Sequence, residues 1–236
     1  MNGVLLVDKP KGWTSFDVVA KIRGLVKQAQ SSSAKASEGL RPKRPRVGHA
    51  GTLDPLATGL LIVLVGDECK NQDKYMKLDK TYEVQLKLGE TSTTDDGEGE
   101  ISKISNKIPA KEEVINTIES FFGEIKQVPP IYSAIKVDGK RAYKLAREGS
   151  KPEMKPRLVT IHSITNIEYK YPYVSFTTFV SSGTYIRSLV RDIGGKLSIG
   201  AYMSDLRRTK IGDKLVTDAY KINSKSTDHS VLDKIE

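Results

Sequence analysis

Two apolar patterns at the start of the chain predict a strand and then a helix. Residues 3–7 form a short apolar run that ends at a turn rich in lysine, proline and glycine, as a buried strand would. Residues 18–26 then place aliphatic side chains at helical spacing, and Thr14 or Ser15 is a suitable N-cap. The periodicity is lost over residues 28–46, where serines, a glycine and prolines predict a mobile, basic loop.

The rest of the chain mixes strand-like and helix-like segments. We expect strands at 60–65, 81–88, 157–169, 173–180 and 201–211, an extended segment at 131–137, helices at 111–122, 142–148 and 185–197, and an acidic loop at 91–100. These segments do not follow a regular βαβ order. The pattern therefore predicts an α+β fold: one domain over residues 1–236, with a mixed, mostly antiparallel central sheet flanked by helices and loops.

Composition restricts the class of protein. The chain has 236 residues, of which 38% are hydrophobic and 28% are charged, as in a soluble globular protein. Its longest apolar run, residues 60–65, is far too short to span a bilayer, and the N-terminus lacks the pattern of a secretory leader. A lone cysteine, Cys69, suits a reducing compartment, and three dispersed histidines offer no zinc pattern. These features predict a cytoplasmic protein without a membrane segment or a metal site.

The distribution of charge along the chain indicates what kind of molecule the protein binds. The formal net charge is +9, and the basic residues gather in three stretches, at 41–46, 140–157 and 187–210. Acidic residues concentrate elsewhere, as in 90–100. Such segregation favours a face that binds a phosphate backbone.

One glycine-rich loop carries the strongest chemical signal. Residues 48–59 read Gly-His-Ala-Gly-Thr-Leu-Asp-Pro-Leu-Ala-Thr-Gly and lead into an apolar run. Rigid scaffolds commonly present reactive groups on such tight loops, which makes Asp54 a candidate catalytic residue. The same residues also suit a plain Asx-type turn, in which Asp54 only accepts hydrogen bonds from nearby backbone N–H groups.

This loop resembles the catalytic motif of the TruB family of pseudouridine synthases. Further segments resemble motifs of that family in the same order, over about residues 3–212: they are 7–15, 80–82, 128–136 with 139–143, 183–189 and 206–209. Several motifs in the right order are far more specific than one loop. The resemblance implies a pseudouridine-synthase-like fold and an enzyme that isomerises uridine to pseudouridine in RNA.

The resemblance also implies roles for particular side chains. Asp54 would be the catalytic carboxylate, acting at the sugar as a nucleophile or as the base of a glycal route. Arg187 would pair with Asp54 and keep it ionised. Tyr82 would lie on the uracil face, Leu206 would line the uracil pocket and Tyr185 would pack beneath the site.

The implied substrate is uridine 55 in the T loop of tRNA. His49 would lie near the RNA strand and help to displace the target base, because an enzyme that reshapes a base must take it out of its stack. Residues 127–155 resemble the flexible thumb that clamps the RNA. No cofactor or metal is implied, and we expect a monomer.

Two features depart from the family pattern. Only residues 213–236 follow the last motif, so we expect no C-terminal RNA-binding domain of PUA type. The basic loop at 28–46 is longer than usual, and its Arg41, Lys43, Arg44 and Arg46 would supply some of the missing RNA contacts.

Two other functions remain open at this point. The basic faces alone would suit a non-catalytic RNA-binding protein. A hydrolase could use Asp54 with Asp8 or Asp95 as its second carboxylate. The joint presence of Asp54, Tyr82 and Arg187 in their motifs favours the isomerase.

Overall fold

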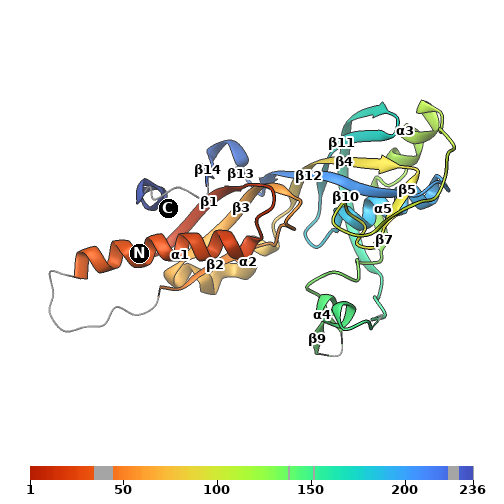
Figure 1. Cartoon of the computed structure of the whole chain (residues 1–236). Coiled ribbons are helices and arrows are strands. Elements are labelled where there is room, and N and C mark those ends of the chain that lie inside the picture. Colours follow the sequence, from red (N-terminus) through yellow and green to blue (C-terminus); the bar gives the residue numbers. More distant parts are fainter. Residues whose placement is uncertain (35–44, 138, 151, 223–228, 236) are drawn as a thin grey trace. The chain divides into compact units, whose positions relative to one another are not determined.

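The computed structural model describes residues 1–34, 45–137, 139–150, 152–222 and 229–235 (Figure 1). The chain divides into two compact units, one formed by Met1–Lys80 with Arg207–Glu236 and the other by Thr81–Leu206. The α+β class expected from the sequence is confirmed, with a mixed, mostly antiparallel sheet flanked by helices. The expected single domain stays a prediction. Within the described ranges, no helix is both long enough and apolar enough to cross a membrane.

The first unit is built on strands β1 (Gly3–Lys9) and β3 (Thr58–Val65), which pair antiparallel. Strand β2 (Val47–Ala50) is antiparallel to β3, and the end of β12 (Ala201–Ile211) runs parallel to it. The smaller elements are β13 (Lys214–Leu215), β14 (Tyr220–Lys221), α2 (Gln72–Met76) and the 3-10 turns η1 (Gly66–Asn71), η2 (Val216–Asp218) and η3 (His229–Lys234).

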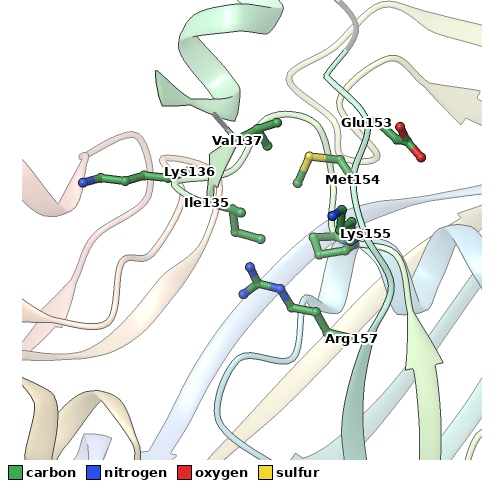
Figure 2. A pocket seen from close by; sticks show the side chains of 8 residues that line it. Ile135, Lys136, Val137, Glu153, Met154, Lys155 and Arg157 are labelled. Atoms are coloured by element: carbon green, nitrogen blue, oxygen red, sulfur yellow. The ribbon is translucent and has the colours of Figure 1, made fainter. Parts of the chain in front are cut away.

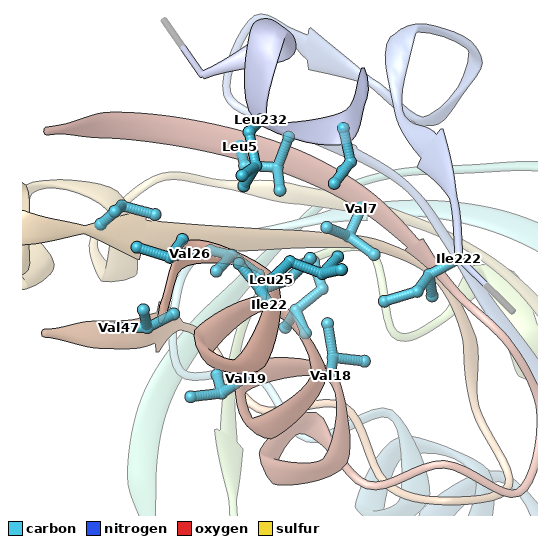
Figure 3. Close-up of a cluster of buried hydrophobic side chains, with 14 residues drawn as sticks. Leu5, Val7, Val18, Val19, Ile22, Leu25, Val26, Val47, Ile222 and Leu232 are labelled. Atoms are coloured by element: carbon cyan, nitrogen blue, oxygen red, sulfur yellow. The ribbon is translucent and has the colours of Figure 1, made fainter. Parts of the chain in front are cut away.

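Helix α1 (Ser15–Ala34) closes the core of this unit. The Thr14 hydroxyl accepts a hydrogen bond from the Asp17 N–H, and the Asp17 carboxylate accepts one from the Thr14 N–H, so the first turn is capped reciprocally. Figure 3 shows Val18, Ile22 and Leu25 of α1 facing aliphatic side chains of the strands. Fully burying one such side chain contributes about 1.5–3 kcal/mol, so this cluster holds α1 against β1 and β3.

Helix α1 corrects one sequence-based prediction. The loop expected from Gln28 is wrong as far as Ala34, because the helix continues to that residue. Glutamine and alanine are good helix formers, and Ala29 still packs against the core. Of the four basic positions expected in the loop, Arg46 directly precedes β2, and the others lie outside the described residues.

The second unit contains the strand order β12-β4-β11-β10-β7, with β4 at Lys80–Leu88, β11 at Tyr173–Val180, β10 at Arg157–Lys170 and β7 at Gly123–Gln127. Helices α3 (Lys111–Glu119) and α5 (Ile186–Lys196) accompany this sheet. Two short hairpins, β5 (Glu90–Ser92) with β6 (Ile101–Lys103) and β8 (Lys136–Val137) with β9 (Lys140–Arg141), and helix α4 (Ala142–Arg147) complete the unit.

Most segments expected in this unit are confirmed, with two corrections. The acidic loop at 91–100 is partly a hairpin, because its first residues belong to β5. The extended segment expected at 131–137 is a strand only at Lys136–Val137. The Ser133 N–H donates instead to the Ile131 carbonyl at 2.9 Å, and the preceding Pro129 and Pro130 have no N–H with which to join a ladder.

Candidate active site

Two strands of the first unit hold the glycine-rich loop. Strands β2 and β3 pair antiparallel from Val47↔Val65 to Ala50↔Ile62, and the loop connects them. Gly59 has φ +102° and lies against β12, where an added Cβ would come within 2.3 Å of the Arg208 carbonyl oxygen. Only glycine fits there.

The residues on both sides of Asp54 are anchored to the N-terminal turn. The Ser15 hydroxyl accepts a hydrogen bond from the Leu53 N–H at 2.9 Å and donates to the Leu53 carbonyl at 3.1 Å. The Pro55 carbonyl accepts from the Gly12 N–H at 2.8 Å. A turn bond from the Ala57 N–H to the Asp54 carbonyl closes the loop. The backbone of Asp54 therefore lies between two fixed points, as a rigidly presented side chain requires.

Lys9 also connects the N-terminal turn to the glycine-rich loop. Its side chain is fully buried, and Nζ donates to the carbonyls of Pro10 at 3.0 Å, Trp13 at 2.6 Å and Pro55 at 3.4 Å. A buried ammonium group is costly unless each of its donors finds an acceptor. The three carbonyls meet that requirement and tie the N-terminal turn to the loop.

Two consecutive arginines of β12 support the other end of the loop. Arg208 is buried, and it donates from Nε to the Leu60 carbonyl at 2.7 Å and from Nη2 to the Gly51 carbonyl at 2.9 Å. Arg207 forms an ion pair with Asp8 at 2.9 Å. The clustering of basic residues in the sequence assigned both arginines to a phosphate-binding face. In the structure, their side chains contact other residues of the protein.

His49 lies on β2 in the same unit as Asp54. Its carbonyl accepts a hydrogen bond from Gln72 Nε2 at 2.7 Å, and its Nδ1 is buried without a partner among the described residues. Burial, and then the positive charge of Arg208, lower the pKa of His49 below its usual value. Burial and charge both favour a neutral imidazole at neutral pH.

The other four predicted site residues belong to the second unit. Tyr82 faces inward on β4 and Leu206 on β12, and each residue is only 7% exposed. Tyr185 precedes α5; its N–H donates to Gln127 Oε1 at 2.8 Å, and Gln127 Nε2 donates to its carbonyl at 3.1 Å. Gln127, which no sequence motif singled out, thus fixes the start of the helix.

Arg187 lies in the first turn of α5 and is held on three sides. Its Nη1 donates to the Thr94 carbonyl at 3.0 Å and its Nη2 to the Tyr132 carbonyl at 2.9 Å. Its Nε lies 3.6 Å from Oδ2 of Asp96, whose carboxylate is also buried. Asp96 in turn accepts a hydrogen bond from the Glu98 N–H at 3.0 Å. One guanidinium therefore links the acidic loop to the segment that follows β7.

A second ion pair braces the same two segments. Arg191, one turn further along α5, lies 3.1 Å from Asp95 and donates to the Val128 carbonyl at 3.0 Å. Burial raises the pKa of Asp95 although Arg191 and Arg187 act to lower it. Asp95 has φ +63°, a left-handed conformation that aspartate tolerates better than most residues.

The structure thus places the predicted residues in two sets. His49 and Asp54 belong to the first unit, and Tyr82, Tyr185, Arg187 and Leu206 belong to the second. The predicted Asp54–Arg187 ion pair would join residues of different units, and it stays a prediction. Sequence reasoning treated residues 91–100 as an acidic loop and considered Asp95 only as the second carboxylate of a hydrolase. The Asp-Asp-Gly turn was the signal for the carboxylates that hold Arg187 and Arg191.

Comparisons with known proteins identify the class of enzyme. The chain of a solved Cbf5–Nop10–Gar1 complex is 28% identical and superposes with a TM-score of 0.66 over 93% of this chain. A chain from an H/ACA ribonucleoprotein bound to a substrate RNA containing 2′-deoxyuridine is 26% identical, with a TM-score of 0.62. This chain spans about half of each, 52% and 50% respectively.

Sequence comparisons specify the family. Residues 38–186 match the N-terminal domain model of the TruB family pseudouridylate synthases, and residues 187–235 match the C-terminal domain model of tRNA pseudouridylate synthase B. The tRNA pseudouridine synthase B of Clostridium kluyveri is 43% identical over 93% of this chain and 70% of its own. That of Parabacteroides distasonis is 43% identical over 89% of this chain and 86% of its own. The chain belongs to the TruB family of pseudouridylate synthases, which are isomerases.

Proposed function

We propose that this protein converts a uridine of tRNA to pseudouridine, that the uridine is position 55 of the T loop, and that Asp54 is the catalytic carboxylate. The anchoring of Leu53 and Pro55 on either side of Asp54 carries the proposal, because it presents one carboxylate on a rigid loop. The relatives named tRNA pseudouridine synthase B and the net charge of +9 support a tRNA substrate.

The reaction defines what Asp54 must do. The N1–C1′ bond of uridine breaks, the uracil turns, and a C5–C1′ bond forms. The C5 proton then leaves, and N1 gains a proton, so atoms balance without an oxidant or a reductant. An ionised Asp54 can act at C1′ as a nucleophile, or remove a sugar proton on a glycal route.

The remaining site residues act on the base and on the carboxylate. Tyr82 stacks on the uracil face, and Leu206 lines the pocket for the ring. Arg187 pairs with Asp54 and keeps it charged, with Tyr185 packed beneath. His49, with its ring in the neutral form, helps to hold the RNA strand from which the uridine has been flipped.

Two ion pairs argue against the hydrolase. Asp8 receives both terminal nitrogens of Arg207, at 3.1 and 2.9 Å, and Asp95 is bound by Arg191. Both carboxylates considered as the hydrolase's partner for Asp54 are therefore engaged in holding the fold together. The isomerase requires no second carboxylate.

Tritium release tests the proposal. A T-arm hairpin RNA labelled at C5 of its uridines is incubated with the protein, and the released tritium is counted. We expect one tritium per RNA, and none when uridine 55 alone is replaced by cytidine. Binding without release would identify a non-catalytic RNA-binding protein, and release that survives the replacement would assign the activity to another uridine.

A further inference from the structure

A pocket of about 210 Å³ opens in the second unit between residues 135–137 and 153–157 (Figure 2). The side chains of Ile135 and Met154 extend into it, and the guanidinium group of Arg157 points into the same space. Lys136 and Glu153 extend away from it on opposite sides. The pocket therefore combines aliphatic walls with one planar cation.

Basic residues outnumber acidic ones in the lining of this pocket, with Lys136, Lys155 and Arg157 against Glu153. Lys155 and Arg157 line it, and in the part of the chain that is described neither forms an ion pair with a carboxylate. The adjacent hairpin adds Lys140 and Arg141, which pair with β8. Arg157 is held in place at its backbone, because it pairs with Gln127 across β10 and β7. A cation with an anchored backbone and no carboxylate partner among the described residues suits an anionic ligand.

We propose that this pocket binds one unpaired nucleotide of the RNA substrate, with the base between Ile135 and Met154 and against the Arg157 guanidinium, and the phosphate at Lys155. The inference rests on the proposed function, since it takes RNA as the substrate. Splayed bases of single-stranded loops stack on planar side chains, among them arginine. The pocket is smaller than the about 300–1,000 Å³ of sites for drug-sized ligands, so it suits a single ring system.

The aliphatic walls distinguish this pocket from a plain phosphate clamp. A phosphate gains nothing from Ile135 and Met154, and a base-paired stem offers no free base to cover them. A nucleotide with its base turned out of the stack satisfies both the apolar and the cationic surface. The pocket would therefore sense whether a particular loop position carries a base.

Binding measurements on variant proteins and variant RNAs test this. The protein variants are Arg157→Gln and Met154→Ala. The control is Lys136→Gln, which removes the same charge from a lining residue whose side chain extends away from the pocket. The RNAs are the T-arm hairpin and a set that carries one abasic nucleotide at each loop position. The dissociation constant of each pair is measured at several salt concentrations.

We expect one abasic position to weaken binding to the unchanged protein by at least about fivefold. RNA that is abasic at that position should bind Arg157→Gln or Met154→Ala almost as well as it binds the unchanged protein. The contact between the base and the pocket is already missing in that RNA. Lys136→Gln should weaken all RNAs by the same factor and lower the log–log salt slope by roughly 0.7–0.9 if it meets one phosphate.

The proposal is wrong if the protein change and the abasic change weaken binding additively at every loop position. That holds even if the unchanged protein isomerises the hairpin. If the unchanged protein binds no hairpin at all, the proposed function itself fails, and the nucleotide pocket fails with it. Arg157 and Met154 are at least partly exposed, so their replacement should leave the fold intact, and thermal unfolding of each variant checks this.

Discussion

Arg187 and Asp96 form a buried ion pair in which Nε lies 3.6 Å from Oδ2 and the two side chains are 7% and 3% exposed. The arginine also reaches two backbone carbonyls on different segments, those of Thr94 and Tyr132. These contacts fix the guanidinium against the acidic loop and the segment that follows β7. An arginine fixed in this way before the substrate arrives is preorganised to orient a carboxylate.

Arg187→Lys tests that arrangement. Lysine keeps the positive charge, but its single nitrogen cannot reach both carbonyls. We expect the single-turnover rate of pseudouridine formation to fall by at least about a hundredfold, and the free energy of unfolding to fall by about 1–3 kcal/mol. A lysine variant with the original rate would show that Arg187 has only a structural role.

Asp96→Asn isolates the charge of the buried carboxylate. The amide oxygen can still accept the Glu98 N–H, but the buried guanidinium loses the negative charge of Asp96. We expect a loss of about 3–5 kcal/mol in unfolding free energy, measured by urea titration. The matched control is Asp192→Asn, whose ion pair with Arg191 is about one-third exposed and should contribute less than about 1 kcal/mol. Equal losses in the two variants would contradict the prediction.

Lys9→Met should loosen the anchor of the catalytic loop. The change preserves length but leaves the carbonyls of Pro10, Trp13 and Pro55 without their shared donor. We expect about 2–4 kcal/mol of destabilisation, together with a slower reaction because Pro55 adjoins Asp54. The neighbouring Lys11 is exposed, and Lys11→Met should change neither property.

Lys80 predicts a dependence of stability on pH. Burial, and then Arg208, lower the pKa of Lys80 from 10.5 to about 8. Between these two values the unfolded chain binds more protons than the folded one, so Lys80 makes stability rise as the pH increases. The difference in unfolding free energy between the original protein and Lys80→Met should grow across this range, by at most about 1.4 kcal/mol per pH unit. A constant difference would show that Lys80 titrates normally.

Periodicity in the sequence predicted most elements of this fold, and the failures have physical causes. The apolar spacing of Val18, Ile22 and Leu25 marked α1, whereas its last turns carry serines that look like loop. His49, Asp54 and Arg187 could be predicted because each lies within a short motif, either the glycine-rich loop or the Gly-Thr-Tyr segment, that is visible in consecutive residues.

The supporting contacts were not predictable in the same way. Arg208 looks like a surface cation in a basic chain, and only tertiary structure shows that it is buried and bonded to carbonyls. Asp96 lies far from Arg187 along the chain, so no spacing rule connects them. Gln127 likewise meets Tyr185 only after β7 and α5 have folded.

Tritium release by Asp54→Asn tests most directly whether Asp54 is the catalytic carboxylate. The amide has nearly the same size and shape as the carboxylate, so the loop and its anchors at Leu53 and Pro55 should be kept, and RNA binding should remain close to that of the unchanged protein. Because the reaction uses the negative charge, we expect single-turnover release from the T-arm hairpin to fall to background. Release by a clean Asp54→Asn preparation at more than a small fraction of the original rate would contradict the assignment of Asp54 as the catalytic carboxylate.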